Sequence, residues 1–156
     1  MKVIRAWAPT VAFLIALLLS GQVVFSQGSE SEGEAPADAA GAELGYYHPD
    51  QVDPGYRVYD MHCAICHGYT LMSGEMGGPP LTGTFFYNYW NGKTVGDMLE
   101  YVRNNMPLGQ PRSLSAAEYA NVVAYILDYN GFPAGETRLE AESPVLGQPI
   151  VQPQGE

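Results

Sequence analysis

The pentapeptide Cys63-Ala64-Ile65-Cys66-His67 contains the only two cysteines among the 156 residues of the chain. Two cysteines separated by two residues and followed directly by a histidine form the attachment signature of a c-type haem. Each thiol adds to one vinyl group of the porphyrin and forms a thioether. The tethered His67 is then presented to the iron from one face, and a neutral imidazole is an ordinary iron ligand. The sequence therefore predicts one haem c, bound covalently through Cys63 and Cys66.

The same spacing has other chemical interpretations. A Cys-x-x-Cys pair forms a redox disulfide in thioredoxin-like proteins, but that motif belongs in a βαβ context, and no such alternation surrounds these residues. A zinc site needs a second pair of ligands at a set spacing, which His48 and His62 do not supply. A chance match of a short motif is the remaining alternative. An export signal and a second axial ligand, both described below, favour the haem.

Residues 1–26 have the features of a secretory signal peptide. Lys2 and Arg5 make a basic start, an unbroken apolar run extends from Val11 to Leu19, and small residues precede a cleavage site before Gln27. The run is shorter than the roughly 20 apolar residues of a spanning helix, although an uncleaved N-terminal anchor is an alternative. We therefore expect an exported, periplasmic protein with no membrane span after signal cleavage.

Composition divides the remainder into three parts. Residues 27–45 carry five acidic side chains and no basic one, and predict a disordered acidic linker. Residues 46–135 form the predicted folded domain, which is small for a single apolar core unless a buried haem supplies its centre. Residues 136–156 contain three prolines and few large apolar residues. We expect them to form an irregular C-terminal tail that lies over the domain.

Three main helices are expected in the domain, so the predicted fold class is all-α. The first begins at Asp53-Pro54, where Asp suits the N-cap and Pro the first helical position. The second spans residues 94–105, with apolar residues at helical spacing. The third follows a capping box formed by Ser115 and Glu118, and it ends at Gly131.

A loop and an aromatic run separate the first two helices. Residues 68–83 are rich in Gly and Pro, so regular structure is not expected there. A backbone carbonyl of this loop is a candidate acceptor for the free ring N–H of His67, which would fix the imidazole as metal sites usually require. Residues 85–90 are interpreted mainly as core packing. Trp90 is a candidate donor to a haem propionate, because a buried indole N–H needs a partner.

The sixth iron ligand has to be a soft or nitrogenous group on the face opposite His67. Met106 is the preferred candidate, because it lies between two predicted helices, 39 residues after His67, in a loop that prolines stiffen. An open position or His48 is the alternative. The remaining candidates are disfavoured: Met61 and His62 share the attachment helix, Met72 and Met76 follow His67 too closely, and Met98 lies on an apolar helix stripe.

Ligation by His67 and Met106 indicates electron transfer. A His/Met pair raises the reduction potential relative to two histidines. Both axial positions are then filled, which leaves no site for a substrate. The sequence therefore favours a one-electron carrier over an enzyme, and an enzyme or gas sensor would need a vacant or displaceable sixth position.

Acidic side chains dominate the expected mature chain. Removing residues 1–26 leaves five basic and seventeen acidic side chains, a net charge of −12 before haem is counted. Nucleic acid and anionic lipid are therefore poor partners. The acidity suits a basic docking patch on a redox protein, or it keeps an exported protein soluble.

From Asp53 to Gly135 the chain resembles a class I cytochrome c, of the single-haem kind associated with quinoprotein (PQQ) alcohol dehydrogenases. The residues that carry the resemblance are Gly55, Tyr59, Cys63, Cys66-His67-Gly68, residues 78–83, Trp90, Met106-Pro107, residues 113–115, residues 118–127 and residues 130–135.

The resemblance implies a cytochrome c fold in which the first and last helices cross, with Gly55 and Tyr59 against Tyr125. It implies that the Pro79 carbonyl supports His67. It also implies a periplasmic quinoprotein dehydrogenase as electron donor, and a terminal oxidase or another cytochrome as acceptor. The acidic linker and the tail leave an alternative, in which the domain is a haem-bearing structural subunit of a larger redox complex or filament.

Overall fold

The computed structural model describes residues 44–152; the predicted signal peptide, most of the predicted linker and the last four residues lie outside this range. The described chain forms five α-helices and two short 3-10 helices, and its β pairing is limited to an isolated bridge between Thr94 and Pro149. The all-α class predicted from the sequence is thus confirmed. Within this range, no helix has the length and apolar character needed to cross a membrane.

The first long helix, α2 (Val52–His62), begins earlier than predicted. A 3-10 helix, η1 (Pro49–Gln51), precedes it directly, and the His48 ring accepts a hydrogen bond from the Asp50 backbone N–H at its start. The chain is therefore already helical when it reaches Asp53, which lies in the first turn of α2 and is not its N-cap. This explains why the expected start at Asp53-Pro54 is wrong.

The aromatic run forms a helix, α4 (Gly83–Trp90), that the sequence did not predict. Phe86 and Trp90, four residues apart, are both buried, while Phe85 and Tyr89 are partly exposed. Aromatic residues have only modest helix propensity, and the run is bounded by glycines, so local pattern gave little sign of a helix. Burial of one aromatic face stabilises it. The preceding residues, 68–82, contain no regular helix, as predicted.

The other two long helices agree with prediction. Helix α5 (Val95–Asn105) starts with a capping box between Thr94 and Asp97, and α6 (Ala116–Tyr129) starts with the predicted one between Ser115 and Glu118. In each box the hydroxyl accepts from the backbone N–H three residues on, and the carboxylate accepts from the N-cap backbone N–H. Beyond α6 the chain reverses at Gly131, which has a φ of 79°.

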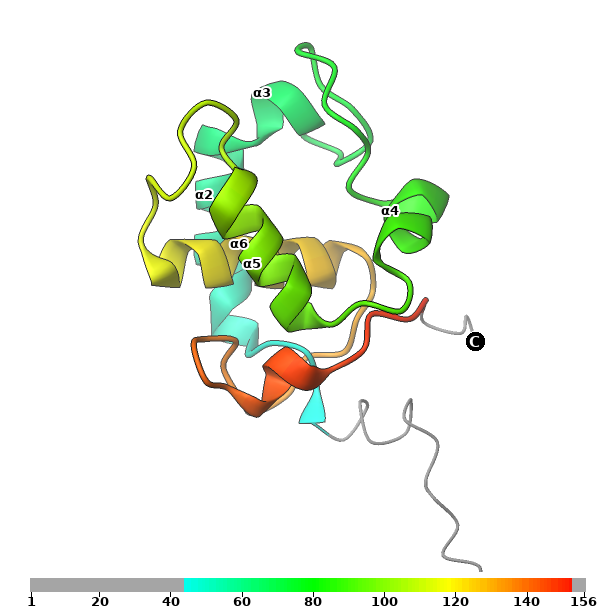
Figure 1. Ribbon diagram of the computed structural model, residues 1–156, viewed down its shortest axis with the longest axis vertical. Coiled ribbons are helices and arrows are strands. Elements are labelled where there is room, and N and C mark those ends of the chain that lie inside the picture. Colours follow the sequence, from blue (N-terminus) through cyan, green and yellow to red (C-terminus); the bar gives the residue numbers. More distant parts are fainter. Residues whose placement is uncertain (1–43, 153–156) are drawn as a thin grey trace, which may run out of the picture. The chain divides into compact units, whose positions relative to one another are not determined.

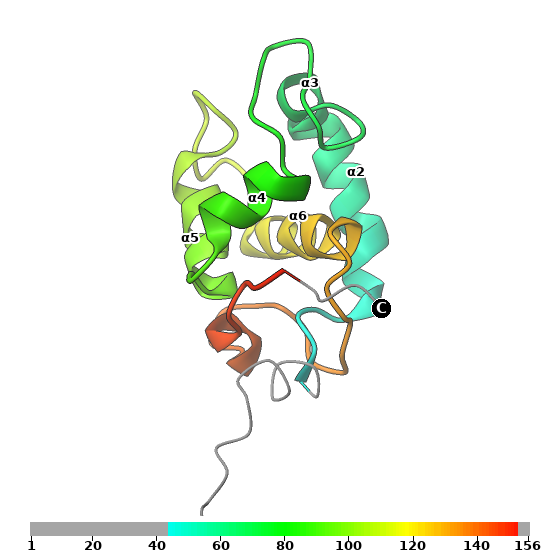
Figure 2. The same cartoon turned by 90° about the vertical axis from the view of Figure 1, so that its right-hand side faces the viewer.

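Helices α2 and α6 cross, as the resemblance implies (Figures 1 and 2). A Cβ at Gly55 would collide with the carbonyl of Asn121 in α6, so the two backbones approach as closely as glycine allows. The rings of Tyr59 and Tyr125 pack with centroids 5.2 Å apart across the same crossing.

The segment after residue 135 belongs to the packed domain. Leu139, Val145 and Ile150 are completely buried, and a short helix, η2 (Pro144–Gly147), contains Val145 and separates Leu139 from Ile150. The segment is tied to the start of α5 by hydrogen bonds from Val95 N–H to the Gln148 carbonyl (3.0 Å) and from Ile150 N–H to the Lys93 carbonyl (2.8 Å). The predicted boundary at residue 135 therefore does not coincide with an end of the domain. The three buried apolar residues, Leu139, Val145 and Ile150, follow neither helical nor strand spacing, so no periodicity revealed them.

At the other boundary, Leu44 and Gly45, predicted as linker, contact the domain. Leu44 packs against the core, and Gly45 lies so close to Gly135 that neither position has room for a Cβ. Tyr46 and Tyr47, which follow, are buried. The packed domain thus includes residues on both sides of the predicted range 46–135.

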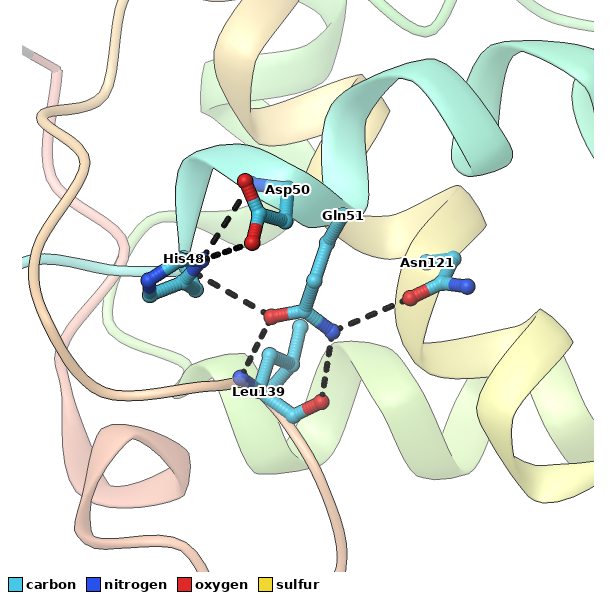
Figure 3. A network of polar contacts seen from close by, with 5 residues as sticks. All are labelled: His48, Asp50, Gln51, Asn121 and Leu139. Carbon is cyan, nitrogen blue, oxygen red and sulfur yellow. Dashed lines mark hydrogen bonds and ion pairs between the residues drawn. The ribbon is translucent and has the colours of Figure 1, made fainter.

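The Gln51 side chain links three distant parts of the fold (Figure 3). Its amide oxygen accepts from the backbone N–H groups of Leu139 (2.7 Å) and His48 (3.2 Å). Its amide nitrogen donates to the Leu139 carbonyl (2.9 Å) and to Asn121 Oδ1 (3.1 Å). Because Gln51 is only 1% exposed, these bonds replace water completely and hold the C-terminal segment against α2 and α6.

Candidate haem site

A cavity of about 360 Å³ is lined by residues of α3 (Ala64–His67), α4, α5 and α6. Figure 1 labels these four helices. This volume falls in the range of roughly 300–1,000 Å³ typical of small-molecule and cofactor sites. Its walls are mainly apolar and include no Asp, Glu, Lys or Arg side chain. All six residues predicted from the sequence or from the resemblance line it: Cys63, Cys66, His67, Pro79, Trp90 and Met106.

The attachment motif forms one tight turn at the end of α2. The Cys63 N–H donates to the Tyr59 carbonyl (2.8 Å), and the N–H groups of Cys66 and His67 both donate to the Cys63 carbonyl (3.0 and 2.9 Å). This turn brings both thiols and the imidazole to one wall of the cavity. The local backbone hydrogen bonds thus hold the three residues together on that wall.

Cys63 and Cys66 are not joined to each other in a disulfide. Burial raises the pKa of the Cys63 thiol to about 12. Reactive redox cysteines have the opposite property, a lowered pKa that makes the thiolate abundant at neutral pH. Among residues 44–152, no three His, Cys, Asp or Glu side chains group as they would around a metal ion. The raised pKa of the Cys63 thiol is therefore not typical of a thioredoxin-like redox pair, and a zinc-type cluster of such ligands is not found among the described residues.

The orientation of His67 is fixed by the loop that follows it. Its Nδ1 atom lies 2.8 Å from the Pro79 carbonyl oxygen. A carbonyl can only accept, so Nδ1 carries the proton and Nε2 keeps the lone pair that binds a metal. The hydrogen bond expected from a loop carbonyl is present, and its acceptor is the proline that the resemblance implies.

Residues 74–78 are held against the attachment turn by backbone hydrogen bonds. The N–H groups of Gly74 and Gly78 both donate to the Cys66 carbonyl (2.9 and 2.8 Å), and the Met76 N–H donates to the Ile65 carbonyl (3.1 Å). A Cβ at Gly78 would lie 3.1 Å from His67 Nδ1 and still closer to the Cys66 backbone, so only glycine fits. The backbone of Met76 is thereby tied to the His67 side of the cavity.

Met106 reaches the cavity from a different part of the chain. It is the C-cap of α5, where its N–H donates to the Val102 carbonyl (2.8 Å), and its own carbonyl accepts from the Tyr119 hydroxyl (2.8 Å). Among the other candidates for sixth ligand, Met76, Met98 and His62 also line the cavity, whereas His48, Met61 and Met72 do not. The preference for Met106 stays a prediction, because several sulfur atoms share this cavity.

An aromatic wall closes the cavity on the α4 side. Trp90 is buried and packs edge-on against Tyr89 and Tyr101, with centroids 5.0 and 5.6 Å away. The Lys93 ammonium lies 3.7 Å from the centre of the Tyr89 ring and 5.0 Å from that of Trp90. Such cation–π contacts hold the lysine over the aromatic surface. The suggested role of Trp90 as a propionate partner stays a prediction.

Sequence reasoning missed the part played by Tyr119. Tyr119 stands at helical spacing before the apolar Val122 and Val123 of α6, and it is buried, at 1% exposure. The available signal was the hydroxyl group, since a buried tyrosine usually finds a polar partner. Which partner it finds depends on the loop between α5 and α6, and that could not be read from local spacing.

Comparison with known proteins agrees with this site. Residues 50–126, just under half of the chain, match the family described as cytochrome c oxidase, cbb3-type, subunit III. Over 104 residues the chain is 30% identical to a thiosulfate dehydrogenase of Stutzerimonas stutzeri (strain A1501), covering 64% of this chain and 33% of that protein. The chain thus spans about a third of the length of this curated relative.

A solved structure that is similar in part is the sulfane dehydrogenase SoxCD from Paracoccus pantotrophus. It shares 21% identity, with a TM-score of 0.45, over 83% of this chain and 68% of that one.

The helical architecture, the attachment turn and the family match define the class: the domain is a c-type cytochrome with an all-α cytochrome c fold. The residues present fit a haem c, since the motif cysteines, a histidine with a free Nε2 and an apolar cavity occur together. Neither the family nor the two relatives named here is a quinoprotein alcohol dehydrogenase, so that association stays an expectation from the sequence.

Proposed function

We propose that the protein is a periplasmic one-electron carrier with a single haem c. The observation that carries the proposal is the hydrogen bond between His67 Nδ1 and the Pro79 carbonyl, in a cavity that both motif cysteines line. Cys63 and Cys66 would hold the haem through thioethers, and His67 and Met106 would be its axial ligands. When bound, the haem supplies a couple that takes up or releases one electron.

Residues around the cavity would set the reduction potential of that couple. The Pro79 carbonyl polarises the imidazole of His67 and makes it a more basic ligand, which favours the oxidised state. The apolar, uncharged walls act in the opposite direction, because burial in an apolar medium disfavours additional positive charge. A thioether ligand such as Met106 likewise raises the potential. The sum of these effects makes reversible one-electron exchange the activity that the cavity supports best.

Partner enzymes are proposed from the rim of the cavity and from the relatives. Met76, Phe85 and Leu108 line the cavity and are exposed, so an apolar surface surrounds it. Such a surface suits brief docking of another redox protein.

The sequence resemblance suggests a quinoprotein dehydrogenase as donor, and the curated relative suggests a thiosulfate-oxidising enzyme. The proposed acceptor is a terminal oxidase or another cytochrome. Stopped-flow reduction of the haem-loaded protein by each class of donor distinguishes the two suggestions.

A second candidate function is that of a haem-bearing subunit in a larger redox assembly. It is favoured by the curated relative, of which this chain covers only 33%. Gel filtration of the exported protein at physiological ionic strength separates the possibilities. A carrier elutes as a monomer and exchanges electrons in solution, whereas a subunit co-elutes with the polypeptides of its complex.

The haem assignment is tested by intact mass and visible spectroscopy after expression in a host that matures c-type cytochromes. We expect one added haem mass that survives denaturation, and its loss in the Cys63→Ser, Cys66→Ser double variant. Colourless wild-type protein without added mass would refute the assignment.

Met106→Ala tests the sixth ligand. Loss of the thioether should lower the reduction potential and open the iron to imidazole or carbon monoxide, because a coordination position becomes free. Potentiometric titration and ligand binding measure both effects. Met72→Ala is the matched control, since Met72 is exposed and does not line the cavity. A potential in Met106→Ala equal to that of the control would exclude Met106.

A further inference from the structure

The backbone of Met106 is fixed on both sides of its α-carbon. Its N–H belongs to the last turn of α5 through the Val102 carbonyl (2.8 Å), and its C=O accepts from the Tyr119 hydroxyl of α6 (2.8 Å). Two different helices therefore determine the position of this one residue. What remains free is rotation about the side-chain bonds that place the sulfur atom.

The rest of the loop between α5 and α6 has much less support from the core. Leu108 is 83% exposed, and residues 109–113 are exposed as well. The far end of the loop is braced to α5, where the Arg112 guanidinium donates to Asn104 Oδ1 (3.0 and 2.8 Å). The hydrogen bond from the Tyr119 hydroxyl ties the Met106 end of the loop to α6.

We propose that Tyr119 is a positioning residue for the sixth ligand: its hydroxyl holds the Met106 carbonyl so that the thioether stays on the iron. This inference rests on the proposed function, in which Met106 is that ligand. Without the hydroxyl, the Met106 peptide loses one of its two anchors. The bond from sulfur to iron then competes less well with an external ligand, because the free loop offers more conformations in which the sulfur is withdrawn.

The substitution Tyr119→Phe isolates this effect. It keeps the buried ring and removes only the oxygen, so the packing of α6 is retained. Tyr87→Phe is the matched control, since the Tyr87 hydroxyl also donates to a backbone carbonyl, that of Asn130 (2.7 Å), and Tyr87 does not line the cavity. The two variants lose the same kind of hydrogen bond at different places in one domain.

The test is imidazole titration of the oxidised, haem-loaded proteins, followed by visible spectroscopy. We expect Tyr119→Phe to bind imidazole roughly 2- to 13-fold more tightly than the wild type, the change that one net hydrogen bond produces. The same variant should lose its thioether-to-iron absorption band at a lower alkaline pH. Tyr87→Phe should match the wild type in both measurements, even if its free energy of unfolding falls as much as that of Tyr119→Phe.

Each outcome decides between specific possibilities. If Met106→Ala binds imidazole tightly but Tyr119→Phe behaves as the wild type, the positioning role is wrong and the ligand assignment survives. Equal effects in Tyr119→Phe and Tyr87→Phe would show general loosening and overturn the proposal. If Met106→Ala itself changes nothing, the ligand assignment fails first.

In the wild-type protein, NMR should show a slowly exchanging Tyr119 hydroxyl proton near Met106, and its absence would contradict the proposal without any variant.

Discussion

Gly55 lies where α2 and α6 touch backbone to backbone. Besides the Asn121 carbonyl, an added Cβ would meet the Tyr125 side chain at 2.9 Å. Neither neighbour moves easily, because one is helix backbone and the other sits among packed rings. A single hydrogen atom in place of a side chain thus sets the distance between the two helices, and with it the position of Tyr59 one turn before Cys63.

We expect Gly55→Ala to lower the free energy of unfolding by about 1–3 kcal/mol, the usual cost of overpacking a core. Urea unfolding of the haem-loaded protein measures this. Gly147→Ala serves as control, since a Cβ there meets nothing within 4 Å. Equal stabilities for the two variants would show that the helices can separate at little cost.

Helix α6 combines a strong local start signal with burial of most of its length. Its capping box lowers the pKa of the Glu118 carboxyl, mainly through the hydrogen bond from the Ser115 hydroxyl and then through that from its backbone N–H. A carboxyl whose folded-state pKa is lowered stabilises the fold at pH values above its unfolded-state pKa. That stabilisation is lost as the pH falls through the lowered, folded-state pKa.

We therefore expect Glu118→Gln to be less stable than the wild type at neutral pH, and the difference to shrink as the pH is lowered into the acid range. Thermal unfolding followed by circular dichroism between neutral and acid pH measures it. Glu140→Gln, an exposed site outside both capping boxes, is the comparison. A difference that stays constant across this range would rule out the carboxylate as its cause.

At the scale of the whole molecule, the segment after residue 135 completes the hydrophobic core against which the helices that line the cavity pack. It contacts η1 through Gln51 and the start of α5 through Gln148 and Ile150. Tyr46, near the beginning of the domain, donates to the Pro149 carbonyl (2.9 Å). The two ends of the described chain thus meet beneath α6, on the side away from α3 (Figure 2).

Ile150→Ala should cost about 2–5 kcal/mol of unfolding free energy, because Ile150 is completely buried and its removal leaves a cavity. Its neighbour Val151 is 36% exposed, and Val151→Ala should have a much smaller effect. Denaturant titration of the two variants provides the measurement. If Ile150→Ala is no more costly than Val151→Ala, the segment does not contribute to the core as its burial indicates.

Features that depend on interactions between residues close in the sequence were predicted better than features that depend on tertiary packing. The ends of α5 and α6 were predictable because capping boxes act over three residues. The six candidate site residues line one cavity, and the motif, the resemblance and the loop position pointed to them. Helix α4 and the start of α2 were not predicted correctly, since burial and a preceding 3-10 turn decided them.

By itself, the sequence determined where a haem would be attached and how the main helices begin, because these depend on neighbours within one or two turns. Only the tertiary structure decided that the tail belongs to the core, that Gln51 bonds a residue 88 positions away, and that Tyr119 reaches the Met106 carbonyl. Those contacts join segments that are far apart in the sequence, so no local sequence pattern connects them. They form because buried polar groups and isolated apolar side chains must find partners once the helices have packed.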